Sequence, residues 1–320
     1  MSDSGCLRAI VPDEYAGKRL DQALSALFPD YSRSRLQVWI REQRVLVDGT
    51  FLAAKTRLSG GEAIEMRPTV EVAAGPVVAE DILLDIIHED ADIIVINKPA
   101  GLVMHPAAGN WQGTVQNALL YHAPALDAVP RAGIVHRLDK DTTGLFVVAK
   151  TLRAHKLLVE QLQARTVSRH YLALVNGNPV SGGSVDRPLG RHPVDRKRMA
   201  VRDSGKPTVT HYRIAERFRA HTLLSVALET GRTHQIRVHM ASIGLPLLGD
   251  PVYGGRPRFA PRTDAAVQAA ISAFKRQALH AFKLALTHPR SGETVSWQAD
   301  VPSDMQTLLD TLREDRDTHG

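Results

Sequence analysis

The 320-residue sequence contains a single cysteine, Cys6, so it cannot form an internal disulfide, and a zinc site built from cysteines is excluded. No apolar run approaches the roughly 20 residues of a transmembrane helix. The acidic N-terminal segment, residues 1–14, also lacks the apolar stretch that a signal peptide requires. These absences predict a protein of the reducing cytoplasm with no membrane partner.

The sequence patterns of two common hydrolase classes are also missing. A G-x-S-x-G turn, which presents the serine of many Ser-His-Asp hydrolases, does not occur. His234 and His239 are five residues apart, rather than the four that align two zinc ligands on one helical face. The remaining candidate ligands are His105 and His136. We expect no metal, although a metal-dependent hydrolase acting on RNA stays open as an alternative that a chelator would reveal.

Composition and charge indicate a globular chain with an anionic partner. Hydrophobic residues make up 43% of the sequence, an ordinary share for a folded protein. Lysine and arginine number 40 against 34 acidic residues, and the net charge of +6 suits a polyanion such as RNA. We expect two domains, residues 1–67 and 81–320, separated by a linker at 68–80 that is rich in proline, alanine and glycine.

The first domain is expected to contain two helices and a hairpin. Apolar residues recur at helical spacing over residues 20–27. Ser32 or Ser34 can cap a second helix, whose apolar face lies within residues 36–40. The string VLVDG at residues 45–49 predicts a hairpin.

Two groups of basic residues could bind an RNA backbone. Arg33, Arg35 and Arg41 lie on the second predicted helix, where they form either a solvated face or a phosphate-binding face. A long polar stretch, residues 176–210, carries the densest basic patch of the chain and is predicted to be a loop. It contains no aromatic residue, so base stacking there is not expected.

The second domain is expected to combine strands with helices. A helix capped by Thr230 or Thr233 runs to about Ser242 and directs Arg237 inward, where a buried cation needs an anion. The chain ends in a helix over residues 302–313, beyond which we expect disorder. Strands are expected at residues 93–96, 166–177, 209–213, 222–228, 278–286 and 294–298.

The polar cluster around which the second domain is organised lies in residues 133–150, which read GIVHRLDKDTTGLFVVAK. The apolar pair Ile134-Val135 and the β-rich run after Gly144 predict a strand, a loop and a second strand. The loop carries Asp139 and Asp141 beside three possible cations. From the residues alone it could be a plain turn, because Asp and Thr bond their own backbone well.

Several strings resemble the RluA family of pseudouridine synthases, most closely its RluD-type members. HRLDKDTTGLFVVAKT resembles the family's catalytic motif, INKPAGLVMHP its first motif and LETGRTHQIRVHM its third. Residues 17–66 resemble an S4-type RNA-binding domain. The resemblance implies an α+β fold: a pseudouridine synthase catalytic domain with a mixed, largely antiparallel sheet, plus a small α/β S4-type domain.

The resemblance also implies roles for individual residues. It makes Asp139 the nucleophile and Tyr171 the side chain that stacks on the target base. Arg237, in preference to Arg232, would be the partner of Asp139. Arg137 would fill the space that the flipped base leaves. Whether the carboxylate attacks the ribose or the uracil ring stays open.

The implied reaction isomerises uridine to pseudouridine and requires no cofactor. The implied substrate is 23S ribosomal RNA, at the helix 69 stem-loop, either free or in a pre-ribosomal particle, and we expect a monomer. A non-catalytic RNA-binding or ribosome-assembly factor is the rival interpretation. Asp139→Asn separates the two, because it would leave an assembly factor fully functional and would inactivate a synthase. The expected substrate-binding residues are His136, Arg137, Arg232, Arg33, Arg35 and Arg41.

Overall fold

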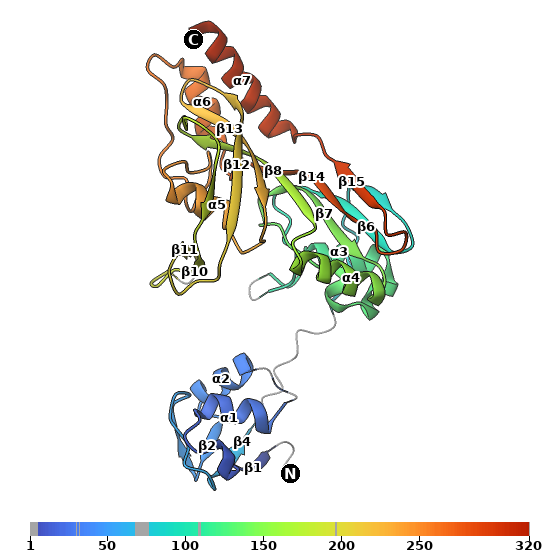
Figure 1. Cartoon of the computed structure of the whole chain (residues 1–320), viewed down its shortest axis with the longest axis vertical. Helices are drawn as coiled ribbons and strands as arrows, with labels where there is room; N and C mark the ends of the chain where they lie inside the picture. Colours follow the sequence, from blue (N-terminus) through green and yellow to red (C-terminus); the bar gives the residue numbers. More distant parts are fainter. Residues whose placement is uncertain are drawn as a thin grey trace. The chain divides into compact units, whose positions relative to one another are not determined.

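The computed structural model describes residues 6–29, 31, 33–67, 77–107, 110–195 and 197–319, without the side chains of Ser34 and Arg35. These residues belong to two compact units, Met1–Pro76 and Val77–Gly320 (Figure 1). Residues 68–76 of the expected linker and the candidate helix cap Ser32 lie outside the described residues.

The first unit combines two helices with a four-stranded sheet around one apolar core. Leu24 of the first helix and Trp39 of the second are both buried in that core, as their helical spacing predicts. The predicted hairpin is present, and Asp48 and Gly49 both have the positive φ that a tight two-residue turn demands. The elements are β1 (Leu7–Ile10), a 3-10 helix η1 (Asp13–Tyr15), α1 (Leu20–Leu27), α2 (Arg33–Arg41), β2 (Val45–Val47), β3 (Thr50–Phe51) and β4 (Ala63–Met66), with strand order β1-β4-β2-β3.

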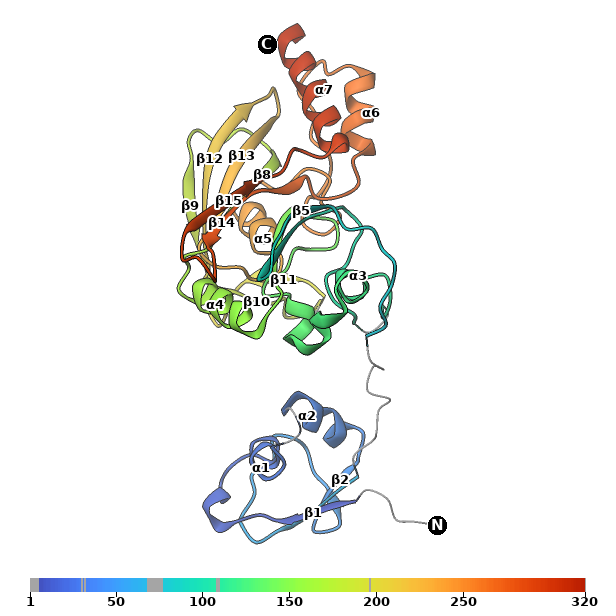
Figure 2. The ribbon, with the colours of Figure 1, turned by 90° about the vertical axis from the view of Figure 1, so that its right-hand side faces the viewer.

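A nine-stranded sheet forms the frame of the second unit (Figure 2). Its order is β5-β6-β7-β14-β8-β13-β12-β9, with β15 paired to β14. Only β7 and β14 run parallel among these pairs, so the expected mixed, largely antiparallel sheet is confirmed. The strands are β5 (Ile86–Glu89), β6 (Ile93–Lys98), β7 (Thr143–Ala149), β8 (Ser168–Asn176), β9 (Gly183–Asp186), β12 (Val209–Arg217), β13 (His221–Leu228), β14 (Leu279–Thr287) and β15 (Thr294–Gln298); a separate hairpin joins β10 (Leu189–Arg191) to β11 (Met199–Val201).

Helices cover both faces of this sheet. Because side chains alternate along a strand, Ile93 and Val95 of β6 pack with α4, whereas Ile94 and Ile96 pack in the cluster that contains α3. A third apolar cluster joins α6 and α7, which lie side by side at one end of the unit (Figures 1 and 2). The helices are α3 (Val115–His122), α4 (Leu152–Gln163), α5 (Gln235–Ser242), α6 (Ala265–Ala273) and α7 (Ser303–His319), with 3-10 helices η2 (Pro124–Ala128) and η3 (Pro130–Gly133).

The strand expected at Ile134-Val135 is wrong. Helix η3 ends just before it, and Ile134 makes only an isolated bridge to Val148 of β7. Gly133 sets this geometry, because its φ is +78° and a Cβ there would lie 1.9 Å from the carbonyl oxygen of Ala149. The chain is thus pressed against β7 and has no room to extend as a paired strand.

Two further expectations need correction. The predicted loop at residues 176–210 contains β9, β10 and β11, because pairing at the sheet edge and within a hairpin satisfies its backbone polar groups. The last helix does not stop at Arg313 but continues to His319. Its final turns are anchored by ion pairs from Arg313 and Arg316 to Glu216 of β12.

Candidate active site

Asp139 lies in the loop that leads into β7, and the buried side chain of Lys98 is hydrogen-bonded to this loop. Lys98, at the end of β6, is 1% exposed and its ammonium donates to the carbonyls of Lys140, Pro99 and Leu102 at 2.7, 2.7 and 3.0 Å. The side chain of Asp139 is 15% exposed. A loop fixed in this way presents its carboxylate in one position.

The predicted contact between Arg237 and Asp139 is present, but it is the weaker of two. Arg237 Nη1 donates to Asp139 Oδ2 at 3.1 Å. Its Nε and Nη2 donate to the two oxygens of Asp250 at 2.7 and 2.9 Å, which is a bidentate pair. The buried guanidinium therefore has two anionic partners, the expected Asp139 and Asp250, which the sequence did not indicate.

Asp250 is itself firmly placed. Its side chain is fully buried, and its Oδ1 accepts the backbone N–H groups of Val252 and Tyr253 at 2.8 and 3.0 Å. Burial raises the pKa of Asp250, but the hydrogen bonds and charge of Arg237 outweigh this and lower it. Burial likewise opposes the charged form of Arg237, and Asp250 raises its pKa above the usual value. Both groups are charged at neutral pH.

A histidine approaches Asp139 from the other side. His234 Nε2 lies 3.9 Å from Asp139 Oδ1, and its Nδ1 is 2.9 Å from the hydroxyl of Tyr253. That hydroxyl also accepts the N–H of Met199 at 2.8 Å. Burial lowers the pKa of His234, while Asp139 opposes the shift. The imidazole thus lies between the carboxylate of Asp139 and the hydroxyl of Tyr253.

The predicted N-cap of helix α5 is wrong. Neither Thr230 nor Thr233 caps α5; His234 occupies the N-cap position with a left-handed φ of 55°. Thr230 instead donates to the side chain of Gln235 at 2.8 Å. A left-handed non-glycine residue is strained, and such strain gathers at functional sites.

Tyr171 faces the same place from β8. It is 5% exposed and lines a small cavity of about 50 Å³ together with Asp139, Arg237 and the loop before α5. Burial raises the pKa of its hydroxyl, so the ring is neutral. The cavity shares Arg137, Arg169, Gly231 and Arg232 with a larger one of about 610 Å³.

Two of the remaining candidates of the second unit line this cavity, and the third lies under the Asp139 loop. Arg137 and Arg232 are exposed and line it. His136 lies beneath the loop, where its Nε2 accepts the N–H of Val147 at 3.1 Å. Burial lowers the pKa of His136 to about 3, so the ring is neutral. This geometry fits an orienting residue.

The candidates of the first unit differ among themselves. Arg33 donates to the buried carboxylate of Asp21 at 2.9 Å, and Arg19 and Gln37 share that carboxylate. Arg41 is exposed and, within the described residues, has no partner. The side chain of Arg35 lies outside the described residues.

Arg33→Ala should therefore change mainly stability, and Arg41→Ala mainly RNA binding. Arg33→Ala removes one donor to a buried carboxylate and should destabilise the first unit by about 1–3 kcal/mol. Arg41→Ala should leave its stability unchanged within about 0.5 kcal/mol and weaken RNA binding with a shallower salt dependence. Urea denaturation and binding titrations at several salt concentrations measure both. Unchanged low-salt affinity in Arg41→Ala would disprove a phosphate-binding face on α2.

Lys98 provides a prediction on pH. Burial lowers its pKa from 10.5 to about 8, although Asp141 and Asp139 oppose the shift. Between pH 8 and 10.5 the unfolded chain then binds a proton that the folded protein has released, so the wild type should gain stability as pH rises, by roughly 3 kcal/mol at most. Lys98→Met should lack this gain, whereas the control Lys156→Met should keep it. Equal slopes of unfolding free energy against pH in all three proteins would contradict the shift.

The sequence analysis missed Asp250 and Tyr253, and it weighed His234 only as a metal ligand. The one available signal was the string GDPVYGG, in which an Asp before Pro is typical of a turn. Within the described residues, one group of potential metal ligands is close enough to share an ion: Asp90, Asp92 and His288. None of the four histidines considered earlier belongs to it, and Asp92 is already paired with Arg290.

Comparisons with known proteins identify related families. The family described as RNA pseudouridylate synthase matches residues 92–242, and the S4 domain family matches residues 18–64. Among curated proteins, the chain is 56% identical to "Ribosomal large subunit pseudouridine synthase D" of Pseudomonas aeruginosa over 99% of both chains. It is 54% identical to the protein of that name from Escherichia coli strain K12, over 98% of this chain and 96% of the other.

Solved structures are similar to a large part of the chain. "Human RNA Pseudouridylate Synthase Domain Containing 4" is 29% identical with a TM-score of 0.56, covering 71% of this chain and 92% of that one. "Human RNA Pseudouridylate Synthase Domain Containing 1" is 23% identical with a TM-score of 0.52, covering 73% and 96%, and supports the fold alone. No helix in the described part of the chain has the length and apolar character needed to cross a membrane.

Proposed function

The chain belongs to the RNA pseudouridylate synthase family, and we propose that it converts uridine to pseudouridine in large-subunit ribosomal RNA with Asp139 as the nucleophile. The observation that carries this proposal is the 3.1 Å contact between a largely buried carboxylate and a guanidinium that Asp250 holds in place. The reaction cleaves the N1–C1′ bond of uridine and joins C1′ to C5 of the same base. The net change is an isomerisation that uses neither oxidant nor group donor.

Two side chains approach the carboxylate of Asp139. Arg237 donates one hydrogen bond to Oδ2 at 3.1 Å, and His234 Nε2 lies 3.9 Å from Oδ1. A carboxylate nucleophile is what this chemistry needs. Because Asp250 holds the guanidinium of Arg237 from its other side, the contact with Asp139 has a fixed geometry.

The target base has to leave its stack to reach Asp139. Unstacking costs a few kcal/mol, and stacking on an aromatic ring returns about 1–3 kcal/mol. Tyr171 is the aromatic side chain that lines the cavity with Asp139, so we assign it the stacking role. Arg137 is exposed at the rim and is our candidate for the space that the base leaves in the RNA.

The substrate is inferred from the relatives, whose names specify the large ribosomal subunit. We propose the helix 69 stem-loop of 23S RNA, free or in a pre-ribosomal particle. We also propose that the protein is a cytoplasmic monomer that needs no cofactor, and that the first unit positions the RNA through its basic helix.

Pseudouridine mapping in ribosomal RNA tests this function. Cells that lack the gene should lose one or more pseudouridines in the large-subunit RNA, and wild-type protein should restore them while Asp139→Asn should not. Full restoration of growth and of ribosome assembly by Asp139→Asn would favour the non-catalytic assembly factor. Activity that a chelator abolishes would favour a metal-dependent enzyme instead.

A further inference from the structure

Arg169 is a buried cation without a partner. It lies on β8 two residues before Tyr171, so both side chains leave the same face of the strand. Its residue is 7% exposed, its Nε has no hydrogen-bond partner, and its guanidinium makes no ion pair with any described residue. An arginine keeps its proton, and only Nε is both fully buried and unpartnered, so the terminal nitrogens remain able to donate. The guanidinium is therefore suited to an anion that the described part of the chain does not contribute.

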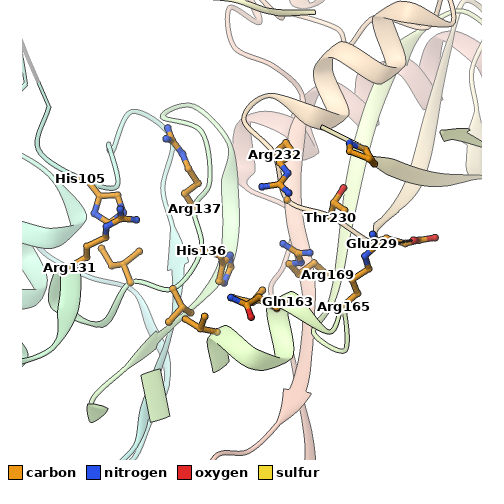
Figure 3. Close-up of a pocket in the computed structure, with 16 residues that line it drawn as sticks. His105, Arg131, His136, Arg137, Gln163, Arg165, Arg169, Glu229, Thr230 and Arg232 are labelled. Atoms are coloured by element: carbon orange, nitrogen blue, oxygen red, sulfur yellow. Dashed lines mark hydrogen bonds and ion pairs between the residues drawn. The ribbon is translucent and has the colours of Figure 1, made fainter. Parts of the chain in front are cut away.

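The loop before α5 leaves space for this guanidinium. A Cβ built on Gly231 would lie 2.5 Å from Arg169 Nη1, closer than any real contact. The guanidinium faces a cavity of about 610 Å³, a volume within the range of small-molecule binding sites (Figure 3). The lack of a side chain at Gly231 thus leaves room for the guanidinium in its present position beside the cavity.

Five arginines line this cavity, which we call the arginine cavity: Arg131, Arg137, Arg165, Arg169 and Arg232. Figure 3 shows Arg131 and Arg137 on one side and the other three on the opposite side.

The charge of the arginine cavity is only partly balanced. Its one acidic lining residue, Glu229, is paired with Arg165 at 2.8 Å and with His211 at 2.7 Å. The guanidinium groups of Arg131, Arg137 and Arg232 have no hydrogen bond or ion pair among the described residues, like that of Arg169. The cavity therefore carries a net positive charge and is suited to an anion.

The arginine cavity adjoins the reacting carboxylate. It shares Arg137, Arg169, Gly231 and Arg232 with the small cavity that Asp139 and Tyr171 line. An anion bound to Arg169 would consequently sit next to a base stacked on Tyr171. In an RNA strand, a phosphate joins each nucleoside to the next, so the anion beside a bound base is a phosphate. A planar guanidinium matches phosphate geometry.

We propose that the arginine cavity is a second nucleotide subsite, in which Arg169 receives the phosphate that joins the target uridine to its neighbour. This inference rests on the proposed function, because it assigns the anion to the same RNA. It makes Arg169 a substrate-binding residue, distinct from the basic residues of the first unit and of residues 176–210.

Single-phosphate neutralisation tests the proposal. The probe is a synthetic helix 69 stem-loop RNA in which one phosphate at a time is replaced by an uncharged methylphosphonate. Wild-type protein should lose at least about 10-fold in affinity at one position beside the target uridine. Arg169→Met should bind the unmodified RNA more weakly by a similar factor and should lose less than about 2-fold further at that position. The control Arg313→Met, on the distant helix α7, should reproduce the wild-type profile.

Identical profiles of wild type and Arg169→Met would overturn the proposal. Thermal melting shows whether Arg169→Met is folded, and it should melt no lower than wild type because it removes an uncompensated buried charge. A lower melting temperature with an unchanged phosphate profile would assign Arg169 a structural role and overturn the proposal too. Pseudouridine formation by wild type on the unmodified RNA is measured separately, so failure of the proposed function is distinguished from failure of this subsite.

Discussion

Replacing Asp139 by asparagine is expected to lower the rate of pseudouridine formation by at least about 10⁴-fold. Asparagine keeps the shape of the side chain and can still accept the hydrogen bond of Arg237, so the fold and RNA binding should persist. An amide, however, is a far weaker nucleophile than a carboxylate. Single-turnover assays, with pseudouridine counted by mass spectrometry of digested RNA, measure the effect.

Asp141→Asn is the matched control for this variant. Asp141 lies two residues along the same loop, and its backbone carbonyl accepts a hydrogen bond from Arg276. Its side chain does not line the Asp139 cavity. We expect Asp141→Asn to retain activity within about 10-fold, in line with an indirect effect on loop position. The nucleophile assignment would be refuted if Asp139→Asn kept more than about 1% of wild-type activity.

Asp250→Leu is expected to produce the largest loss of stability. Arg237 is 5% exposed and would be left without the bidentate partner that neutralises it. Breaking a buried ion pair by removing one member typically costs about 3–5 kcal/mol. Activity should also fall sharply, because the guanidinium would lose the partner that fixes its position beside Asp139, the proposed nucleophile.

A double variant separates the two effects. Arg237→Met combined with Asp250→Leu replaces the pair by apolar side chains and should recover most of the lost stability, yet it should remain inactive. As a control, Asp310→Leu breaks an exposed pair with Arg313 and should cost no more than about 1 kcal/mol. Urea denaturation measures all three proteins. A loss below about 1 kcal/mol in Asp250→Leu, or an active double variant, would contradict the assigned network.

Much of the fold could be predicted because the apolar residues of its elements have a clear period. Helix α1 and strand β13 coincide closely with the predicted ranges 20–27 and 222–228. The pair Ile134-Val135 had an equally apolar pattern but is not a strand. What decides its conformation is the close contact of Gly133 with Ala149, which is a tertiary contact that no local period reports.

The site could be predicted to a similar extent. The resemblance to a known family indicated that Asp139, Tyr171 and Arg237 belong together, and the structure places them around one cavity. It did not indicate Asp250, because an Asp that satisfies the N–H groups of its own turn shows no sign of a second partner. Nor could it reveal the unpaired state of Arg169, since a missing contact is visible only when every neighbour has been placed.

The position of β14 has a consequence for the timing of activity. This strand stands between β7, which follows the Asp139 loop, and β8, which carries Tyr171. During synthesis, Asp139 and Tyr171 are therefore both present well before residues 279–287. The distance between them is fixed only once those residues have been translated and form β14. We expect a chain that ends before β14 to be inactive, because the strand between the Asp139 loop and Tyr171 would be missing.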